Sequence, residues 1–119
     1  MLDFLFVALV IGLIYVWWSR RQAVPTISTD ALRQKLAQDR TLQVIDVREV
    51  HEYKTGHIKQ AKNVPLSRFN HSDARISKDK PVYVICQSGM RSQRAAAMLK
   101  QAGYTDVYSV KGGMNFWRG

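Results

Sequence analysis

Cysteine is almost absent from this sequence, in which Cys86 is the only one among 119 residues. A lone thiol cannot form an internal disulfide, so the fold does not depend on an oxidising compartment. The length suits one domain, because a chain of about 100 residues buries a working core without disulfides. The single thiol therefore serves either core packing or chemistry.

Acidic residues are scarce as well, with 9 Asp and Glu against 18 Lys and Arg. Such a balance favours anionic partners, namely nucleic acid, a membrane surface or small anionic substrates. The basic residues are nevertheless scattered, with no run longer than Arg20-Arg21 and no zinc-finger or helix-turn-helix pattern. We therefore expect no nucleic-acid partner. His51, His57 and His71 follow no metal-ligand spacing, and we expect neither a metal nor an organic cofactor.

Charge is missing altogether from residues 4–18, FLFVALVIGLIYVWW. A helix from Met1 to Trp18 spans about 27 Å at 1.5 Å per residue, close to the roughly 30 Å hydrocarbon core of a bilayer. A buried core helix and a cleaved signal peptide are the alternatives. A signal peptide normally has a positive amino-terminal region and a cleavage site of small residues, whereas this segment has Asp3 and ends in Trp17-Trp18.

The flanks of this segment indicate an orientation. Tyr15, Trp17 and Trp18 suit an interfacial aromatic belt, and Arg20-Arg21 suits the cytoplasmic side of a membrane. The sequence thus predicts one transmembrane helix in residues 1–21 and a domain in residues 22–119. We expect a single-pass protein of the bacterial inner membrane whose domain faces the cytoplasm.

The rest of the chain shows no internal repeat or low-complexity tract, and its apolar patterns alternate between helix and strand. Alternation of this kind predicts an α/β domain with a small, mostly parallel sheet and helices on both faces. The expected helices are residues 28–38, 49–54 and 91–102, with loop and room for a helical turn in residues 67–80. The expected strands are residues 42–47, 61–64, 81–85 and 107–110, followed by a short turn through Trp117.

The loop CQSGMRS, residues 86–92, joins the clearest strand to the clearest helix. Ligands of open α/β sheets bind where strands turn into helices. Successive amides of a tight loop and the positive end of the following helix together favour an anion. Gly89 allows the amides to point inward, and Arg91 adds positive charge. These features favour a thiolate at Cys86, although a cysteine at the end of a buried strand is often inert core packing.

Three motifs in order resemble the rhodanese, or thiosulfate sulfurtransferase, homology domain across residues 26–118. They are the loop CQSGMR, the stretch VIDVREVHEYKTGHIKQAKNVP from Val44 to Pro65, and GGMNFW from Gly112 to Trp117. The resemblance implies that Cys86 accepts a sulfane sulfur, becomes a persulfide and passes the sulfur to cyanide or a thiol. It also implies that the persulfide and a small anionic donor are bound by the amides of the loop residues Gln87, Ser88, Gly89, Met90 and Arg91.

Loop length distinguishes two chemistries that this scaffold supports. The related dual-specificity phosphatases have one more residue between cysteine and arginine, whereas four residues separate Cys86 from Arg91. The shorter spacing disfavours phosphatase or arsenate reductase activity. Because no second cysteine is present, we expect an external acceptor such as a small thiol or a thioredoxin-like protein. The alternative is a non-catalytic module that binds a protein partner or senses reactive sulfur at the membrane.

Other candidate residues have plainer interpretations. Asp46 and Arg48 are more consistent with an ion pair or capping network at a strand end than with substrate contacts, and Arg48 lies one helical turn from Glu52 as a further partner. We interpret His57 as a hydrogen-bonded turn residue rather than a catalytic or metal-binding one. Gly112-Gly113 predicts a backbone turn that approaches the loop, and Trp117 predicts packing of the terminal turn.

Overall fold

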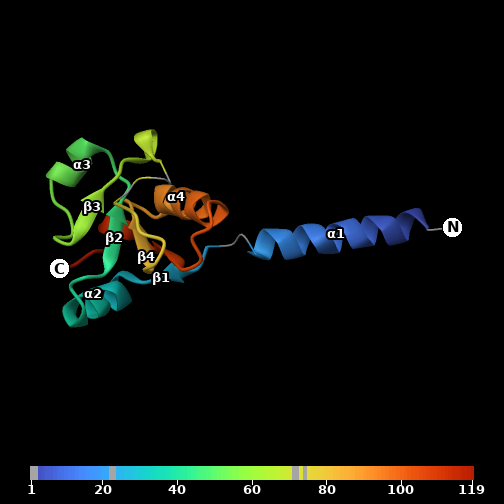
Figure 1. The fold of residues 1–119 in the computed structure, drawn as a ribbon, viewed down its shortest axis with the longest axis horizontal. Helices are drawn as coiled ribbons and strands as arrows, with labels where there is room; N and C mark the ends of the chain where they lie inside the picture. The colour runs from blue at the N-terminus through green and yellow to red at the C-terminus, as the bar shows by residue number, and fades with distance from the viewer. Residues whose placement is uncertain (1–2, 22–23, 71–72, 74) are drawn as a thin grey trace.

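A parallel sheet forms the centre of the protein. The computed structural model describes residues 3–21, 24–70, 73 and 75–119. Within them five strands, all parallel, lie in the order β1-β5-β4-β2-β3 (Figure 1). The strands are β1 (Thr26–Ile27), β2 (Gln43–Asp46), β3 (Ala61–Asn63), β4 (Val82–Ile85) and β5 (Val107–Val110). The predicted α/β fold with a parallel sheet is confirmed.

Helices cover both faces of this sheet. Leu32 and Leu36 of α2 (Thr29–Gln38) pack in one core cluster, whereas Leu99 of α4 (Met90–Gln101) packs in the other. The remaining elements are α1 (Phe4–Arg21), α3 (Val50–Lys54) and the 3-10 turns η1 (Leu66–Arg68) and η2 (Gly113–Asn115). The two faces are covered as the alternation of helix and strand predicted.

The central strands alternate their side chains between the two core clusters. Ile45 of β2 and Val84 of β4 belong to the cluster under α4, and Val44 and Ile85 belong to the cluster under α2. All four side chains are buried. Their near-continuous apolar sequences follow from burial on both faces, which is usual for parallel sheets.

Two local signals set the ends of the helices. The hydroxyl of Ser28 accepts a hydrogen bond from the N–H of Ala31, which caps α2 as the sequence predicted. Helix α4 follows Gly89, whose φ of 109° lies in the left-handed region that favours glycine. Helix α4 therefore starts directly after the loop that carries Cys86.

The edge strand β1 was not predicted from the sequence. It has two residues, and it pairs through Thr26 with Ser109 and through Ile27 with Val110 of β5. So short a strand has no periodicity of its own, and it forms because β5 offers an open edge. Residue 22, where the predicted boundary between residues 1–21 and 22–119 falls, lies outside the described residues.

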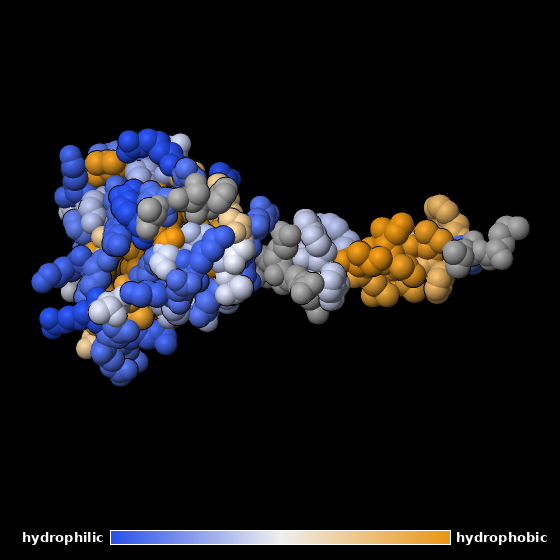
Figure 2. Space-filling view, viewed as in Figure 1, coloured by the Kyte–Doolittle hydropathy of each residue, from blue (hydrophilic) through white to orange (hydrophobic). Residues whose placement is uncertain are grey.

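The helix α1 extends away from the sheet (Figure 1), and large apolar and aromatic side chains from Phe4 to Trp18 are exposed on it. Figure 2 shows the hydrophobic colour on the outer part of this helix and a paler, more hydrophilic colour nearer the domain. Within the part of the chain that the structure describes, no helix has both the length and the apolarity needed to span a bilayer. The predicted transmembrane anchor and inner-membrane, cytoplasm-facing location are therefore wrong. The physical reason is length, because the 15 uncharged residues of this stretch rise about 22 Å, short of the roughly 30 Å of a hydrocarbon core.

Candidate active site

The Cys86 side chain lies at the carboxyl end of β4, where the strand turns into the loop before α4. Its Sγ accepts a hydrogen bond from the N–H of Gly89 at 3.0 Å. The thiol also lies 3.5 Å from Oγ of Ser92. The side chain is completely buried and belongs to the core cluster under α4. The thiol is thus buried as core packing requires, yet its sulfur atom accepts a hydrogen bond from the backbone of the loop.

The loop presents further amides beside this sulfur. Met90 and Arg91 open the first turn of α4, where backbone N–H groups have no acceptor within the helix. The positive end of the helix dipole adds to these groups. The arrangement favours negative charge at the sulfur and on any group attached to it.

Ser92 is a member of the site that the sequence did not reveal. Its hydroxyl donates to the carbonyl oxygen of Gly89 at 3.0 Å and lies 2.7 Å from Oγ of Ser109. Both serines are buried. The available signal was a polar residue on the apolar face of α4, in line with Ala95, Ala96 and Leu99. Ser92 ties the turn at Gly89 to β5 and fixes the position of the thiol.

The side chain of Gln87 is occupied by the protein itself. Its Oε1 accepts from Nη1 of Arg48 at 3.2 Å, and its Nε2 donates to Oδ1 of Asn115 at 2.7 Å. By contrast, Ser88 is exposed and the Met90 side chain is 80% exposed. Gln87 therefore connects the loop to Arg48, just after β2, and to η2, and only its backbone remains for a ligand.

Arg91 forms an ion pair with Glu52 of α3. Nη1 lies 2.7 Å from Oε1 and Nη2 lies 2.9 Å from Oε2. Hydrogen bonds from Arg91, opposed by partial burial, lower the pKa of Glu52 from 4.5 to about 2. The same contact raises the pKa of Arg91. Arg91 thus lies beside the loop with a carboxylate already bound to its guanidinium.

Arg48 pairs with Asp46 and not with Glu52. Its Nη2 lies 2.9 Å from Oδ2 of Asp46 and also donates to the carbonyl oxygen of Gly56 at 2.7 Å. Both members of the pair are buried. The predicted ion pair at the strand end is confirmed, but the suggested partner Glu52 is wrong because that carboxylate is held by Arg91.

The turn at Gly112-Gly113 contacts the cysteine loop through its backbone. The N–H of Met114 donates to the carbonyl oxygen of Cys86 at 2.8 Å, and that of Asn115 donates to the oxygen of Gln87 at 3.0 Å. A Cβ at Gly113 would collide with the backbone of Cys86. The expected approach of this turn to the loop is confirmed.

The remaining candidates lie outside this cluster. Nδ1 of His57 lies 2.8 Å from the carbonyl oxygen of Tyr53, as expected for a turn residue. Trp117 packs against the core cluster under α2, as expected for the terminal turn. No three His, Cys, Asp or Glu side chains come together as a metal site in the described part of the chain, and His71 lies outside it.

Comparisons with known proteins show what this chain is similar to. The family model of the rhodanese-like domain matches residues 28–119. The chain is 39% identical to YqhL, an uncharacterized protein of Bacillus subtilis, over 97% of this chain and 89% of that one. It is 35% identical to the thiosulfate sulfurtransferase GlpE of Pseudomonas savastanoi pv. phaseolicola, over 80% and 85% of the two chains. A crystal structure of a rhodanese-like domain protein from Staphylococcus aureus matches with a TM-score of 0.74 at 32% identity, over 80% of this chain and 92% of that one.

Proposed function

This chain belongs to the rhodanese-like domain family, and from that premise we propose that it is a sulfurtransferase that carries sulfane sulfur on Cys86. The observation that carries the proposal is the hydrogen bond from the N–H of Gly89 to Sγ of Cys86. A sulfur that accepts an amide hydrogen at the start of a helix is placed to hold negative charge. Relatives named thiosulfate sulfurtransferase support the reaction class.

The transfer consists of two displacements at sulfur. In the first, the Cys86 thiolate attacks the outer sulfur of a donor such as thiosulfate, the S–S bond of the donor breaks, and sulfite leaves with the electron pair. In the second, cyanide or a thiolate attacks the outer sulfur of the persulfide, and the Cys86 thiolate leaves. Charge and electrons balance in both steps, so neither an outside oxidant nor a general base is needed.

The loop supplies electrostatic stabilisation for both steps. The amides of Gly89, Met90 and Arg91 would stabilise the outer sulfur of the persulfide. Ser88 and the backbone of Gln87 complete the proposed donor site. Because Sγ of Cys86 has no exposed surface, residues 87–91 must move to admit a donor.

The complete burial of Cys86 favours a second candidate, a non-catalytic module that uses this fold to bind a partner or to sense reactive sulfur. A thiol that no donor reaches remains unmodified and serves packing alone. The two candidates differ in whether the wild-type thiol accepts sulfur.

Intact mass spectrometry of the full chain separates them. We expect incubation with thiosulfate to add one sulfur atom, and addition of cyanide to remove it with release of thiocyanate. Cys86→Ser is expected to abolish both events, while Gln93→Ala, which alters an exposed side chain of α4 outside residues 87–91, retains them. Absence of the adduct with thiosulfate, a polysulfide and a thiosulfonate alike would establish the non-catalytic module.

A further inference from the structure

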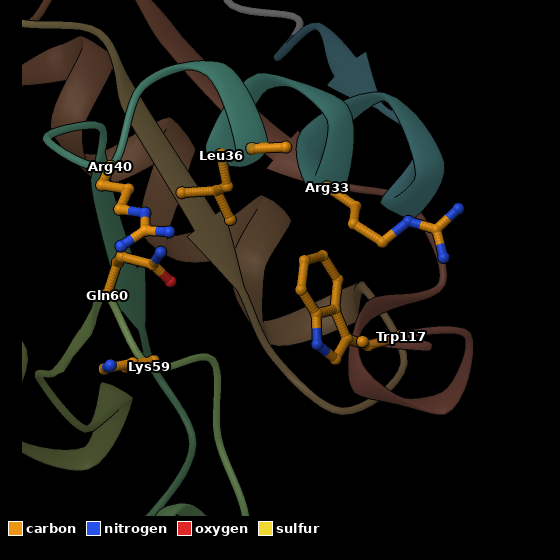
Figure 3. A pocket seen from close by; sticks show the side chains of 8 residues that line it. Arg33, Leu36, Arg40, Lys59, Gln60 and Trp117 are labelled. Atoms are coloured by element: carbon orange, nitrogen blue, oxygen red, sulfur yellow. The ribbon is translucent and has the colours of Figure 1, made fainter.

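A basic groove lies along α2 and at the amino-terminal ends of the central strands, whereas the cysteine loop follows the carboxyl end of β4. Two cavities of about 560 Å³ and about 340 Å³ share Arg40 and Gln60 in their walls. We name their union the α2 groove. Figure 3 shows the first cavity, with Arg40, Lys59 and Gln60 toward one end and the indole of Trp117 toward the other.

The cations of the α2 groove fall into two groups. Arg33 is engaged by Asp30 at 3.5 Å and by the carbonyl oxygen of Arg118, and Arg75 is paired with Asp73. The others have no ion pair with any described residue, and they are Arg40, Lys59, Lys62 and Lys80. All four are exposed. The groove thus presents four positive charges that form no ion pair with a described residue.

No described Asp or Glu lines either cavity. Asp39 and Asp73 lie outside the cavity walls, and the pKa of each is lowered chiefly by hydrogen bonds and, to a smaller extent, by Lys80 and Lys62 respectively. In a chain of formal net charge +9, this surface repels a second copy of itself. Charge complementarity therefore requires an anionic occupant.

The apolar wall narrows the choice of anion. Leu36 and Ala37 of α2 and the ring of Trp117 line one end of the groove, while the free cations line the rest. A free phosphate would leave that wall unused, and a single compact anion would fill one cavity only. An extended peptide rises about 3.3 Å per residue, so alternate acidic side chains reach successive cations while one apolar side chain contacts the indole.

We propose that the α2 groove docks an extended acidic segment of a partner protein that carries several carboxylates and one large apolar side chain. Trp117 gives the segment a physical connection to the cysteine loop. The backbone N–H of Trp117 donates to the carbonyl oxygen of Met114, and the backbone N–H of Met114 donates to the carbonyl oxygen of Cys86. The binding surface itself stands whether or not Cys86 transfers sulfur, because it uses none of the loop side chains.

Fluorescence anisotropy tests the proposal on the full chain. The probe is a fluorescein-labelled peptide of about a dozen residues, with glutamate at alternate positions and a central phenylalanine. We expect Arg40→Glu/Lys59→Glu to weaken binding by at least about tenfold. Arg94→Glu/Lys54→Glu is the matched control, because it changes the net charge equally on α4 and α3, outside both cavities. It should change affinity by less than about twofold.

Three outcomes of the binding assay overturn the proposal. Equal loss in the two double variants would reduce the interaction to net charge. Tighter, groove-dependent binding of an oligonucleotide, or displacement of the peptide by ATP at an equal concentration, would assign the groove to nucleic acid or to a small anion. Amide chemical shifts of the wild-type chain, titrated with the peptide, give the same answer without variants. We expect changes at Arg40, Gln60 and Trp117, and their absence would also contradict the proposal.

Discussion

The carboxylate of Glu52 accepts two hydrogen bonds, of 2.7 Å and 2.9 Å, from the guanidinium of Arg91. The two residues are 39 positions apart in the chain, and they join α3 to the first turn of α4. Arg91 is therefore held at the loop by a negative charge that an anionic donor must approach. The pair both orients the guanidinium and reduces its attraction for anions.

Replacing this carboxylate by an amide should strengthen the attraction of Arg91 for an anionic donor. In Glu52→Gln the side chain still offers an oxygen to Arg91, but the negative charge at the loop is lost. If the chain transfers sulfur, we expect the KM for thiosulfate to fall about threefold to tenfold, because charges near a protein surface interact by a few kcal/mol at most. Steady-state thiocyanate assays measure this change. An increase in KM would show that the charge of Glu52 acts by positioning alone.

The same pair makes stability depend on acid. The pKa of Glu52 is about 2 in the folded protein against 4.5 ordinarily, so its contribution is complete above pH 4.5 and is lost as the pH falls toward 2. We expect a loss of about 1 to 2 kcal/mol, because the pair is partly exposed and therefore screened. Urea unfolding at several pH values measures it. Glu52→Gln should show a correspondingly smaller acid dependence, and an unchanged profile in that variant contradicts the assignment.

Buried and exposed ion pairs should differ in their effect on stability. Asp46→Ala leaves Arg48, which is 3% exposed, without its carboxylate in the interior, and we expect the free energy of unfolding to fall by about 3 to 5 kcal/mol. The comparison variant is Asp73→Ala, which breaks the exposed pair with Arg75 and should cost less than about 1 kcal/mol. Denaturant unfolding curves of both variants measure the two losses in free energy of unfolding. Equal losses would contradict the expected difference between a buried and an exposed ion pair.

The close approach of η2 to the cysteine loop requires glycine. Gly113 has a φ of 57°, and an added Cβ would meet the backbone of Cys86. We expect Gly113→Ala to destabilise the fold by at least about 2 kcal/mol. Gly56→Ala separates strain from collision, because Gly56 also has a positive φ but open space around it. Thermal unfolding of both variants measures the two effects, and we expect Gly56→Ala to lose less stability than Gly113→Ala. A larger loss in Gly56→Ala would exclude the collision as the cause.

The hydroxyl of Ser92 should influence the reactivity of Cys86. Ser92→Ala removes the hydroxyl that accepts from Sγ of Cys86 and donates to the carbonyl oxygen of Gly89. We expect the rate of sulfur loading to fall about threefold to tenfold, because the turn that directs the N–H of Gly89 at the sulfur loses a hydrogen bond of about 1 kcal/mol. Ser109→Ala should have less effect, because Ser109 reaches the thiol only through Ser92. Time-resolved mass spectrometry gives the rates, and unfolding curves verify that both variants fold. Equal rates in Ser92→Ala and wild type would remove Ser92 from the site.

Local patterns were sufficient for much of the fold. The apolar runs of β2 and β4, the Ser28 cap of α2 and the spacing along α4 each act within a few residues, so periodicity and capping identify them. The sequence also shows the length of the uncharged segment Phe4–Trp18. The prediction of a membrane anchor depended on including Met1 to Asp3 in the length that was compared with the bilayer core. The short β1 had no such signal, because its pairing with β5 alone creates it.

The sequence by itself determined the parallel α/β architecture and the loop between a buried strand and a helix that carries the only cysteine. Tertiary structure alone decided that Glu52 pairs with Arg91 rather than with Arg48, whose pairing with Asp46 the sequence already favoured. It also placed Ser92 against the thiol and gathered the cations of the α2 groove. The physical reason is that hydrophobic period and helix caps are local, whereas these contacts exist only once β2 and β4 lie side by side and bring distant chain segments together.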